Sequence, residues 1–210
     1  MEQNINRSLI EDDEKYKTKN YIAGKTIIGF INTFKNLLEP LEPSTILEAG
    51  CGTGYITERI AEMKNTSITH IKAFDSDDGK IMEAKKRVAG VDFFTGSIYE
   101  IPFSDDSFDL VVSTEVLEHL EEPDKALIEL LRVSNEYLLV SVPDEPIWRI
   151  TKMLRGKYLR DFGNTPGHIN HWSKRRWKAF LREYCDIKIF ETPFPWLMAL
   201  CIKRNLNKQI

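Results

Sequence analysis

The chain has 210 residues with the composition of an ordinary globular protein: 42% hydrophobic, 29% charged and 10% aromatic. That balance excludes a disordered, collagen-like or coiled-coil chain. The formal net charge of −3 implies no general attraction to nucleic acid or to a membrane surface. The sequence has no run of about 20 apolar residues, the length that a membrane-spanning helix needs. The acidic N-terminus lacks the pattern of a secretory signal. We therefore expect a cytoplasmic protein whose whole length, 1–210, forms one domain.

Hydrophobic spacing predicts an N-terminal helix over 21–41, in which apolar residues recur on one face until Pro40 and Pro43 end it. After this helix, short apolar runs alternate with amphipathic segments. The expected strands are 45–49, 68–74, 91–95, 109–113 and 136–142, and the expected helices are 55–63, 77–88, 115–120 and 123–132. Strands joined through helices lie parallel, and right-handed crossovers place the helices on both faces of the sheet.

The C-terminal part follows a different pattern. We expect a helix over 174–184 and strands over 186–191 and 194–202. Two residues separate these strands, which is too few for a parallel crossover, so the strands should pair as an antiparallel hairpin. The predicted fold class is α/β, a Rossmann-like, doubly wound sheet of seven mostly parallel strands that ends in a C-terminal antiparallel hairpin.

A glycine-rich turn, Leu47-Glu-Ala-Gly-Cys-Gly-Thr-Gly-Tyr55, lies where the first strand meets its helix. Open α/β sheets bind ligands at this place, and glycines let ligand atoms approach the main chain. The dinucleotide fingerprint needs a glycine where the chain has Tyr55. The acid Glu48 disfavours a pyrophosphate and suits a cationic ligand. These features argue against a nicotinamide-dependent oxidoreductase, which stays as an alternative.

A second acid, Asp75, ends the second strand and could accept two hydrogen bonds from a ribose diol. A ligand with a ribose, a positive charge and no phosphate is S-adenosylmethionine. Four segments, in order, resemble the signatures of class I S-adenosylmethionine-dependent methyltransferases, of the type 11 group. They are Glu48-Ala-Gly-Cys-Gly-Thr-Gly54, Phe74-Asp-Ser-Asp77, Gly96-Ser-Ile-Tyr-Glu-Ile-Pro-Phe103 and Ser107-Phe-Asp-Leu-Val-Val-Ser-Thr-Glu-Val-Leu-Glu-His-Leu120.

The resemblance implies a binding site for S-adenosyl-L-methionine. Its expected residues are Glu48, Ala49, Gly50, Cys51, Gly52, Asp75, Ser76, Ser97, Ile98 and Thr114. Glu48 and the glycine turn would hold the methionine end, and Asp75 would hold the ribose. Ser97 and Ile98 would flank the adenine, and the backbone near Thr114 would line the sulfonium side. Many relatives have Asp where this chain has Ser97, so only a hydroxyl or the backbone is available there.

The acceptor side is expected around Glu115, Glu118 and His119, whose i, i+3, i+4 spacing would place them on one face of a helix. Three interpretations stay open. His119 could be a general base, since an ordinary histidine titrates near pH 6.5. The E-x-x-E-H pattern is also similar to the divalent-metal site of ubiquinone-biosynthesis O-methyltransferases and small-RNA 2′-O-methyltransferases, which His168 or His171 could complete. Alternatively, these acids only favour the start of a helix.

The segment 144–173 is long for a connection without a role. Between Arg149 and Arg182 the chain has ten Lys or Arg and one acid, Asp161. Such a basic, aromatic segment suits an anionic or planar acceptor or a lipid headgroup. Alternatively, its charges form a solvated face while Trp148 and Trp172 belong to the core. The turn signal of residues 163–167 could let this segment close over substrate.

The resemblance divides the domain into four parts: an N-terminal leader and helix over 1–43, a cofactor-binding core over 44–143, a substrate lid over 144–173, and a C-terminal helix and hairpin over 174–210. It implies methyl transfer to an O or N atom of a small acceptor, which an anionic group would suit. Nucleic acid is not an expected partner. A non-catalytic protein that binds S-adenosylmethionine or regulates a partner is the second alternative, because a fold does not by itself imply catalysis.

Overall fold

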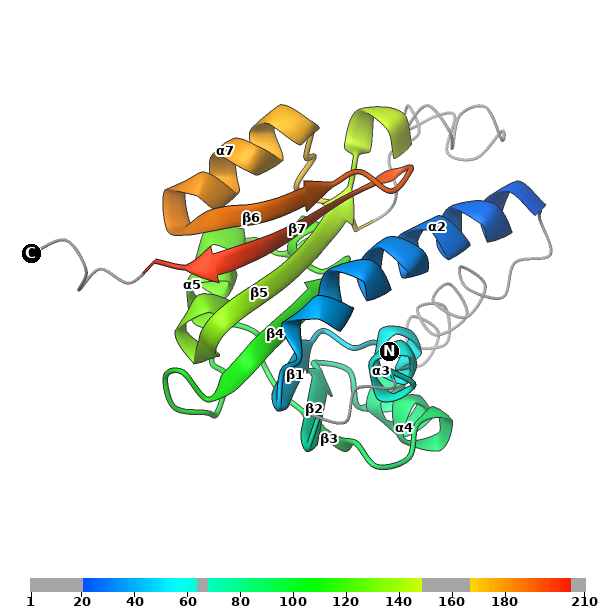
Figure 1. Cartoon of the computed structure of the whole chain (residues 1–210), viewed down its shortest axis with the longest axis vertical. Coiled ribbons are helices and arrows are strands. Elements are labelled where there is room, and N and C mark those ends of the chain that lie inside the picture. Colours follow the sequence, from blue (N-terminus) through cyan, green and yellow to red (C-terminus); the bar gives the residue numbers. More distant parts are fainter. Residues whose placement is uncertain (1–20, 64–67, 149–166, 205–210) are drawn as a thin grey trace, which may run out of the picture.

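A computed structural model describes residues 21–63, 68–148 and 167–204 (Figure 1). Within these ranges the strands form a seven-stranded sheet of order β3-β2-β1-β4-β5-β7-β6. Its strands are β1 Thr45–Ala49, β2 His70–Asp75, β3 Asp92–Thr95, β4 Phe108–Thr114, β5 Ser134–Pro143, β6 Cys185–Glu191 and β7 Trp196–Lys203. The expected strands are therefore present, with ends that differ from the prediction by a few residues.

The pairing of the strands follows the predicted topology. Strands β1 to β5 are mutually parallel, while β7 runs antiparallel to both β5 and β6. The chain first builds outward from β1 through β2 to β3 and then returns to place β4 on the other side of β1. This reversal puts the carboxyl ends of β1 and β4 at a topological switch point, where open α/β sheets bind ligands. The predicted fold class is confirmed.

Helices cover both faces of the sheet (Figure 1). They are α2 Tyr21–Leu38, α3 Tyr55–Ala61, α4 Asp78–Arg87, α5 Pro123–Val133 and α7 Lys174–Tyr184, with 3-10 turns η1 Glu39–Leu41 and η2 Leu117–His119. On one face, Leu127 of α5 and Trp177 of α7 share a hydrophobic cluster, with α5 against β5 and α7 against β6. On the other, Phe34 of α2 and Ile60 of α3 share a hydrophobic cluster with buried residues of β1, β4 and β7. Burial of these apolar stripes is what fixes the helices on the sheet.

Local signals explain where several helices begin. Asp77 caps α4, since its carboxylate accepts hydrogen bonds from the amides of Gly79 and Lys80. Ser173 caps α7 in the same way, and Pro123 starts α5. Among the described residues, the structure has no helix that combines the length and the apolar character needed to cross a bilayer.

Candidate active site

The glycine turn joins β1 to α3 through a backbone that only glycine adopts readily. Gly50, Gly52 and Gly54 have positive φ angles of 78°, 53° and 82°. A Cβ on Gly50 would lie 2.4 Å from Cγ2 of Val116, so the turn also needs the missing side chain there. The amides of Gly50 and of the next residue, Cys51, both donate to the carbonyl of Phe74, at 2.8 and 2.9 Å. The turn is thereby tied to the end of β2.

Asp75 lies directly against this turn. Its Oδ2 accepts from the amide of Gly52 at 2.9 Å, and its Oδ1 accepts from the amide of Asp77 at 3.1 Å. Each carboxylate oxygen keeps a second lone pair, so the two bonds orient Asp75 and leave acceptor capacity for ligand hydroxyls. The structure therefore brings Asp75 together with the glycine turn, as the sequence predicts. Its neighbour Ser76 is exposed.

Glu48 is a buried carboxyl at the end of β1, with 1% of its surface exposed. Thr57, on the first turn of α3, donates its hydroxyl to Oε2 of Glu48 at 2.5 Å. Burial raises the pKa of Glu48 to about 8; the bond from Thr57 opposes this shift, and the charge of Asp75 adds to it. A carboxyl of this kind is largely protonated near neutral pH, and a nearby ligand cation would favour its ionised form.

The Cys51 thiol in the same turn is also buried. Burial raises its pKa far above the ordinary value, and the charges of Glu48 and Asp75 act in the same direction. Because the thiolate is the nucleophilic form of cysteine, Cys51 is suited to packing and not to covalent chemistry.

The predicted adenine-flanking residues lie beyond β3. Ser97 is exposed, and its Oγ accepts from the amide of Tyr99 at 3.2 Å, while Ile98 is buried against the core that contains Phe74. Thr114, at the end of β4, is buried. The site residues predicted for the cofactor thus come from the ends of β1, β2, β3 and β4. Which of them contact a ligand stays a prediction.

The prediction that Glu115, Glu118 and His119 share one helical face is wrong. Glu115 has a positive φ of 59° and lies before the short 3-10 turn η2, which holds the other two. Its Oε2 accepts from Nε1 of Trp196 at 2.7 Å, so the side chain is directed to the start of β7. A left-handed residue interrupts helical periodicity, and Pro123 then begins a separate helix.

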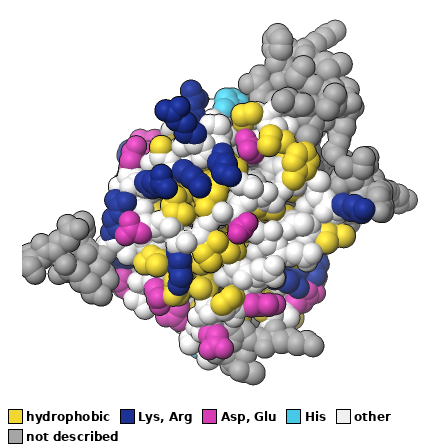
Figure 2. All heavy atoms as spheres, turned by 45° about the horizontal axis from the view of Figure 1, so that its top comes forward, with side chains coloured by type: hydrophobic (Ala, Val, Ile, Leu, Met, Phe, Trp, Pro, Cys, Tyr) yellow, Lys and Arg dark blue, Asp and Glu magenta, His cyan; other side chains and the backbone are white. Residues whose placement is uncertain are grey.

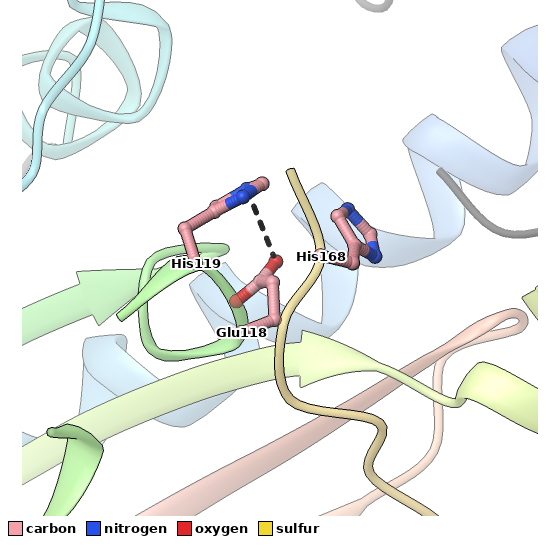
Figure 3. Close-up of side chains that lie close together, drawn as sticks. All are labelled: Glu118, His119 and His168. Atoms are coloured by element: carbon pink, nitrogen blue, oxygen red, sulfur yellow. Dashed lines mark ion pairs between the residues drawn. The ribbon is translucent and has the colours of Figure 1, made fainter. Parts of the chain in front are cut away.

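Glu118 and His119 instead meet His168 from the segment that follows residue 166 (Figure 3). One potential ligand atom from each of the three lies within 4.8 Å of the others. Nε2 of His119 lies 4.0 Å from Oε1 of Glu118, and the two imidazole centroids are 4.9 Å apart. Glu118 is buried and His119 is exposed, so the cluster opens to solvent on the side of His119.

Main-chain contacts hold this cluster together. Nδ1 of His119 lies 2.9 Å from the carbonyl oxygen of Gly167. The carbonyl of Glu118 accepts from the amides of Ile169 and Asn170, at 2.9 and 3.0 Å. The side-chain amide of Asn170 donates to the carbonyls of two residues of the turn region, Leu117 and Leu120. Residues 167–170 are therefore bound to η2 through several hydrogen bonds.

Of the two later histidines, His168 joins the cluster and His171 does not. Both face a further acid, Glu145, with Nδ1 of His168 at 2.5 Å and Nδ1 of His171 at 3.6 Å from its oxygens. Sequence reasoning missed both Glu145 and Thr57. The available signal for Glu145 is its place directly after β5, at the same edge of the sheet as the other site residues.

The segment expected to cover substrate is described only at its ends, and residues 149–166, with their basic side chains and most of the turn signal, lie outside the described residues. Trp148 packs against Trp196, and Trp172 packs against Trp177, so both expected core tryptophans contact the hydrophobic clusters. Four basic residues of α7 are exposed: Lys174, Arg175, Arg176 and Arg182. Figure 2 shows a face of the molecule on which Lys and Arg side chains gather.

Known proteins resemble the chain chiefly over the segment that carries the glycine turn. The methyltransferase domain family matches residues 47–136. A probable S-adenosylmethionine-dependent methyltransferase of Mycolicibacterium smegmatis is 35% identical over 101 residues, 47% of this chain and 38% of that protein. A demethylmenaquinone methyltransferase of Clavibacter sepedonicus is 36% identical over 97 residues, 45% of this chain and 38% of that protein. The matched region is less than half of either relative's length.

The likeness to solved structures extends over nearly the whole chain. Magnesium protoporphyrin IX methyltransferase from Synechocystis, solved with bound SAH, has a TM-score of 0.65 and covers 97% of this chain and 94% of its own, at 15% identity. At this low sequence identity, the structural likeness shows a common fold alone. The family match covers Glu48, Asp75, Glu118 and His119, while His168 lies outside the matched residues. Residues 47–136 thus carry a methyltransferase domain similar to that of S-adenosylmethionine-dependent methyltransferases, on the fold that such enzymes share.

Proposed function

We propose that this protein transfers the methyl group of S-adenosylmethionine to an O or N atom of a small acceptor. The observation that carries the proposal is Asp75, held by the amides of Gly52 and Asp77 beside the buried Glu48. An oriented diol acceptor and a buried acid at one switch point suit a ligand with a ribose and a cationic amino-acid end. No phosphate-binding feature is needed for this ligand.

The proposed reaction is an in-line displacement. The acceptor lone pair forms a bond to the methyl carbon, the carbon–sulfur bond breaks, and its electron pair returns to sulfur. S-adenosylhomocysteine, the methylated acceptor and one proton are the products. The protein has to align the two reactants and receive the proton, because no covalent intermediate is required.

His119 is suited to receive that proton. The carbonyl of Gly167 can only accept a hydrogen bond, so the bond at 2.9 Å places the imidazole hydrogen of His119 on Nδ1. Nε2 then carries the lone pair and lies on the side of Glu118. A general base acts through such a lone pair.

The same three side chains also fit a divalent cation. Glu118, His119 and His168 offer one oxygen and two nitrogens within 4.8 Å of one another, a mixed set that suits a transition metal. A cation held there would lower the pKa of an acceptor hydroxyl and fix its position. Base and metal make different predictions, since methyl transfer through His119 as a base alone would survive exhaustive chelation.

Relatives suggest acceptors without identifying one for this chain. One relative is the demethylmenaquinone methyltransferase of Clavibacter sepedonicus, and another is a malonyl-[acyl-carrier protein] O-methyltransferase of Buchnera aphidicola, 30% identical over 113 residues. The exposed basic residues of α7, such as Lys174 and Arg175, favour an acceptor with an anionic group. The cytoplasmic location and the four-part division of the chain stay predictions.

Titration calorimetry with S-adenosylhomocysteine tests the cofactor assignment. Asp75→Ala should weaken binding at least about tenfold, because a lost charged hydrogen bond costs roughly 1.5–3 kcal/mol. Asp92→Ala is the matched control, since this exposed aspartate of β3 pairs with Lys72 and lies outside the predicted cofactor residues. Equal affinity of the wild type and Asp75→Ala, or no binding at millimolar ligand, would refute the proposal. Binding without methyl transfer to any component of a metabolite extract would favour the non-catalytic alternative.

A further inference from the structure

A buried carboxylate outside the cofactor site faces the histidines of the acceptor side. Glu145 begins the helical turn after β5 and has 1% of its surface exposed. Its amide donates to the carbonyl of Trp172 at 2.9 Å, and the amide of Asp144 donates to the carbonyl of Pro195 at 3.0 Å. The backbone that carries Glu145 is therefore anchored on two sides.

Burial of an acid costs free energy unless the carboxylate is engaged by partners. Oε1 of Glu145 lies 2.5 Å from Nδ1 of His168, whose side chain is 6% exposed, and Oε2 lies 3.6 Å from Nδ1 of His171. The short contact joins two nearly inaccessible groups. It thus fixes the orientation of the His168 ring more firmly than a contact at the surface could.

We propose that Glu145 is a positioning residue, which keeps the hydrogen of His168 on Nδ1 and so presents the Nε2 lone pair of His168 to Glu118 and His119. This inference rests on the proposed function, in which these three side chains form the acceptor side. The hydrogen bond made by one ring nitrogen decides which nitrogen carries the lone pair. Carboxylates that accept from the distal nitrogen of a histidine orient metal-binding imidazoles in this way.

For His119, the carbonyl of Gly167 accepts the hydrogen bond from Nδ1 and so orients the ring. Both imidazoles are then held through Nδ1, and a potential ligand atom of each lies within 4.8 Å of the other and of a carboxylate oxygen of Glu118 (Figure 3). One histidine is held by a neutral carbonyl and the other by a carboxylate, so removal of Glu145 affects His168 directly and leaves the bond of His119 to Gly167 in place. This difference makes the proposal testable at a single residue.

The first measurement is the tautomer of each histidine in the full chain, from long-range ¹H–¹⁵N correlation spectra at a pH where the rings are neutral. In the wild type, His168 should carry its hydrogen on Nδ1. Glu145→Ala should shift His168 to the Nε2–H form, and Glu145→Gln should retain Nδ1–H, because the amide oxygen can still accept. A wild-type His168 protonated on Nε2, or an unchanged tautomer in Glu145→Ala, would overturn the proposal.

The second measurement is binding of Co²⁺ alone, followed by its visible absorption. Glu145→Ala should bind Co²⁺ about 10- to 100-fold more weakly, as is typical when a carboxylate partner of a ligating histidine is removed. Glu145→Gln should fall between the two. His171→Ala is the matched control, because His171 contacts Glu145 and lies outside the cluster, and its Co²⁺ affinity should equal that of the wild type. Equal Co²⁺ affinity of Glu145→Ala and the wild type would overturn the proposal.

S-adenosylhomocysteine binding separates this inference from the proposed function. A Glu145→Ala variant that keeps wild-type affinity for S-adenosylhomocysteine is folded in its cofactor part, so its other changes report on His168. Failure of the wild type to bind S-adenosylhomocysteine would refute the proposed function, while the tautomer spectra would still decide the role of Glu145.

Discussion

Gly50→Ala offers a test of the glycine turn, because the structure separates the two costs of the substitution. Gly50 has a φ of +78°, and an added Cβ would lie 2.4 Å from Cγ2 and 3.3 Å from Cγ1 of Val116. Gly90 has nearly the same φ, +77°, and an added Cβ there would meet no atom within 4 Å. Gly90→Ala therefore reports the backbone strain alone, and Gly50→Ala reports strain and clash together.

The magnitudes follow from these two environments. An L-residue in the left-handed region costs roughly 1–2 kcal/mol, and this cost is common to both variants. Alanine also lowers the entropy of the unfolded chain relative to glycine by a similar amount at both sites, so that contribution cancels in the difference. The overlap with the stiff, β-branched Val116 adds about 1–3 kcal/mol to Gly50→Ala only. The difference between the two free energies of unfolding is therefore expected to be about 1–3 kcal/mol.

Urea denaturation of both variants measures this difference, and a double-mutant cycle assigns it. In Gly50→Ala combined with Val116→Ala, the methyl groups that cause the overlap are absent, so the pair should be more stable than the sum of the single effects predicts. S-adenosylhomocysteine affinity should fall in Gly50→Ala and stay unchanged in Gly90→Ala. Equal destabilisation by the two glycine variants, or additivity in the cycle, would refute the proposed contact.

Three further predictions concern other described contacts. The raised pKa of Glu48, about 8, means that the folded protein retains a proton that the unfolded chain releases above its ordinary pKa of 4.5. The contribution of Glu48 to stability is therefore complete below that ordinary value and falls as pH rises toward 8, by up to about 1.4 kcal/mol per pH unit. This fall should be absent in Glu48→Gln when urea midpoints are compared across pH. Asn170→Ala should lower the free energy of unfolding by about 1–3 kcal/mol in the same assay, because two carbonyls of the η2 region lose their donor. A loss of less than about 0.3 kcal/mol would contradict this expectation. Trp196→Phe removes the donor to Glu115 and should lower the free energy of unfolding by about 1–3 kcal/mol. Glu115→Gln keeps an acceptor for Trp196, so it should lower the free energy of unfolding by less. A larger loss in Glu115→Gln than in Trp196→Phe would refute a stabilising role of this hydrogen bond.

The fold could be predicted from the sequence because its elements carry strong local signals. The helix α5 begins at Pro123 and has one continuous apolar face, and the apolar run of β1 ends in a glycine turn. Such patterns predict an element from its own residues. Asp75 could also be placed, since an acid at the end of a parallel strand lies at the ligand-binding edge of the sheet.

The acceptor side could not be predicted to the same extent, because its geometry depends on contacts between distant segments. The spacing of Glu115, Glu118 and His119 is compatible with a helix, but the left-handed φ of Glu115 and its bond to Trp196 redirect the chain. The pairing of Glu145 with His168 spans 23 residues and joins a strand end to a later segment. Neither contact leaves a periodic pattern in the sequence, so only the tertiary structure reveals it.

The two halves of the site meet in one short piece of chain, the residues that follow β4. The side chain of Val116 packs where Gly50 has no Cβ, and the amide of Glu115 donates to the carbonyl of Ser141 at 3.0 Å. The segment is thus fixed on the cofactor turn at one end and on β5 at the other, and Glu118 and His119 follow within three residues of Val116. Methyl transfer depends on the alignment of donor and acceptor, and small displacements of either are costly in rate. In the proposed reaction, these two contacts would link the turn that holds the cofactor to the turn that carries His119 and so supply this alignment.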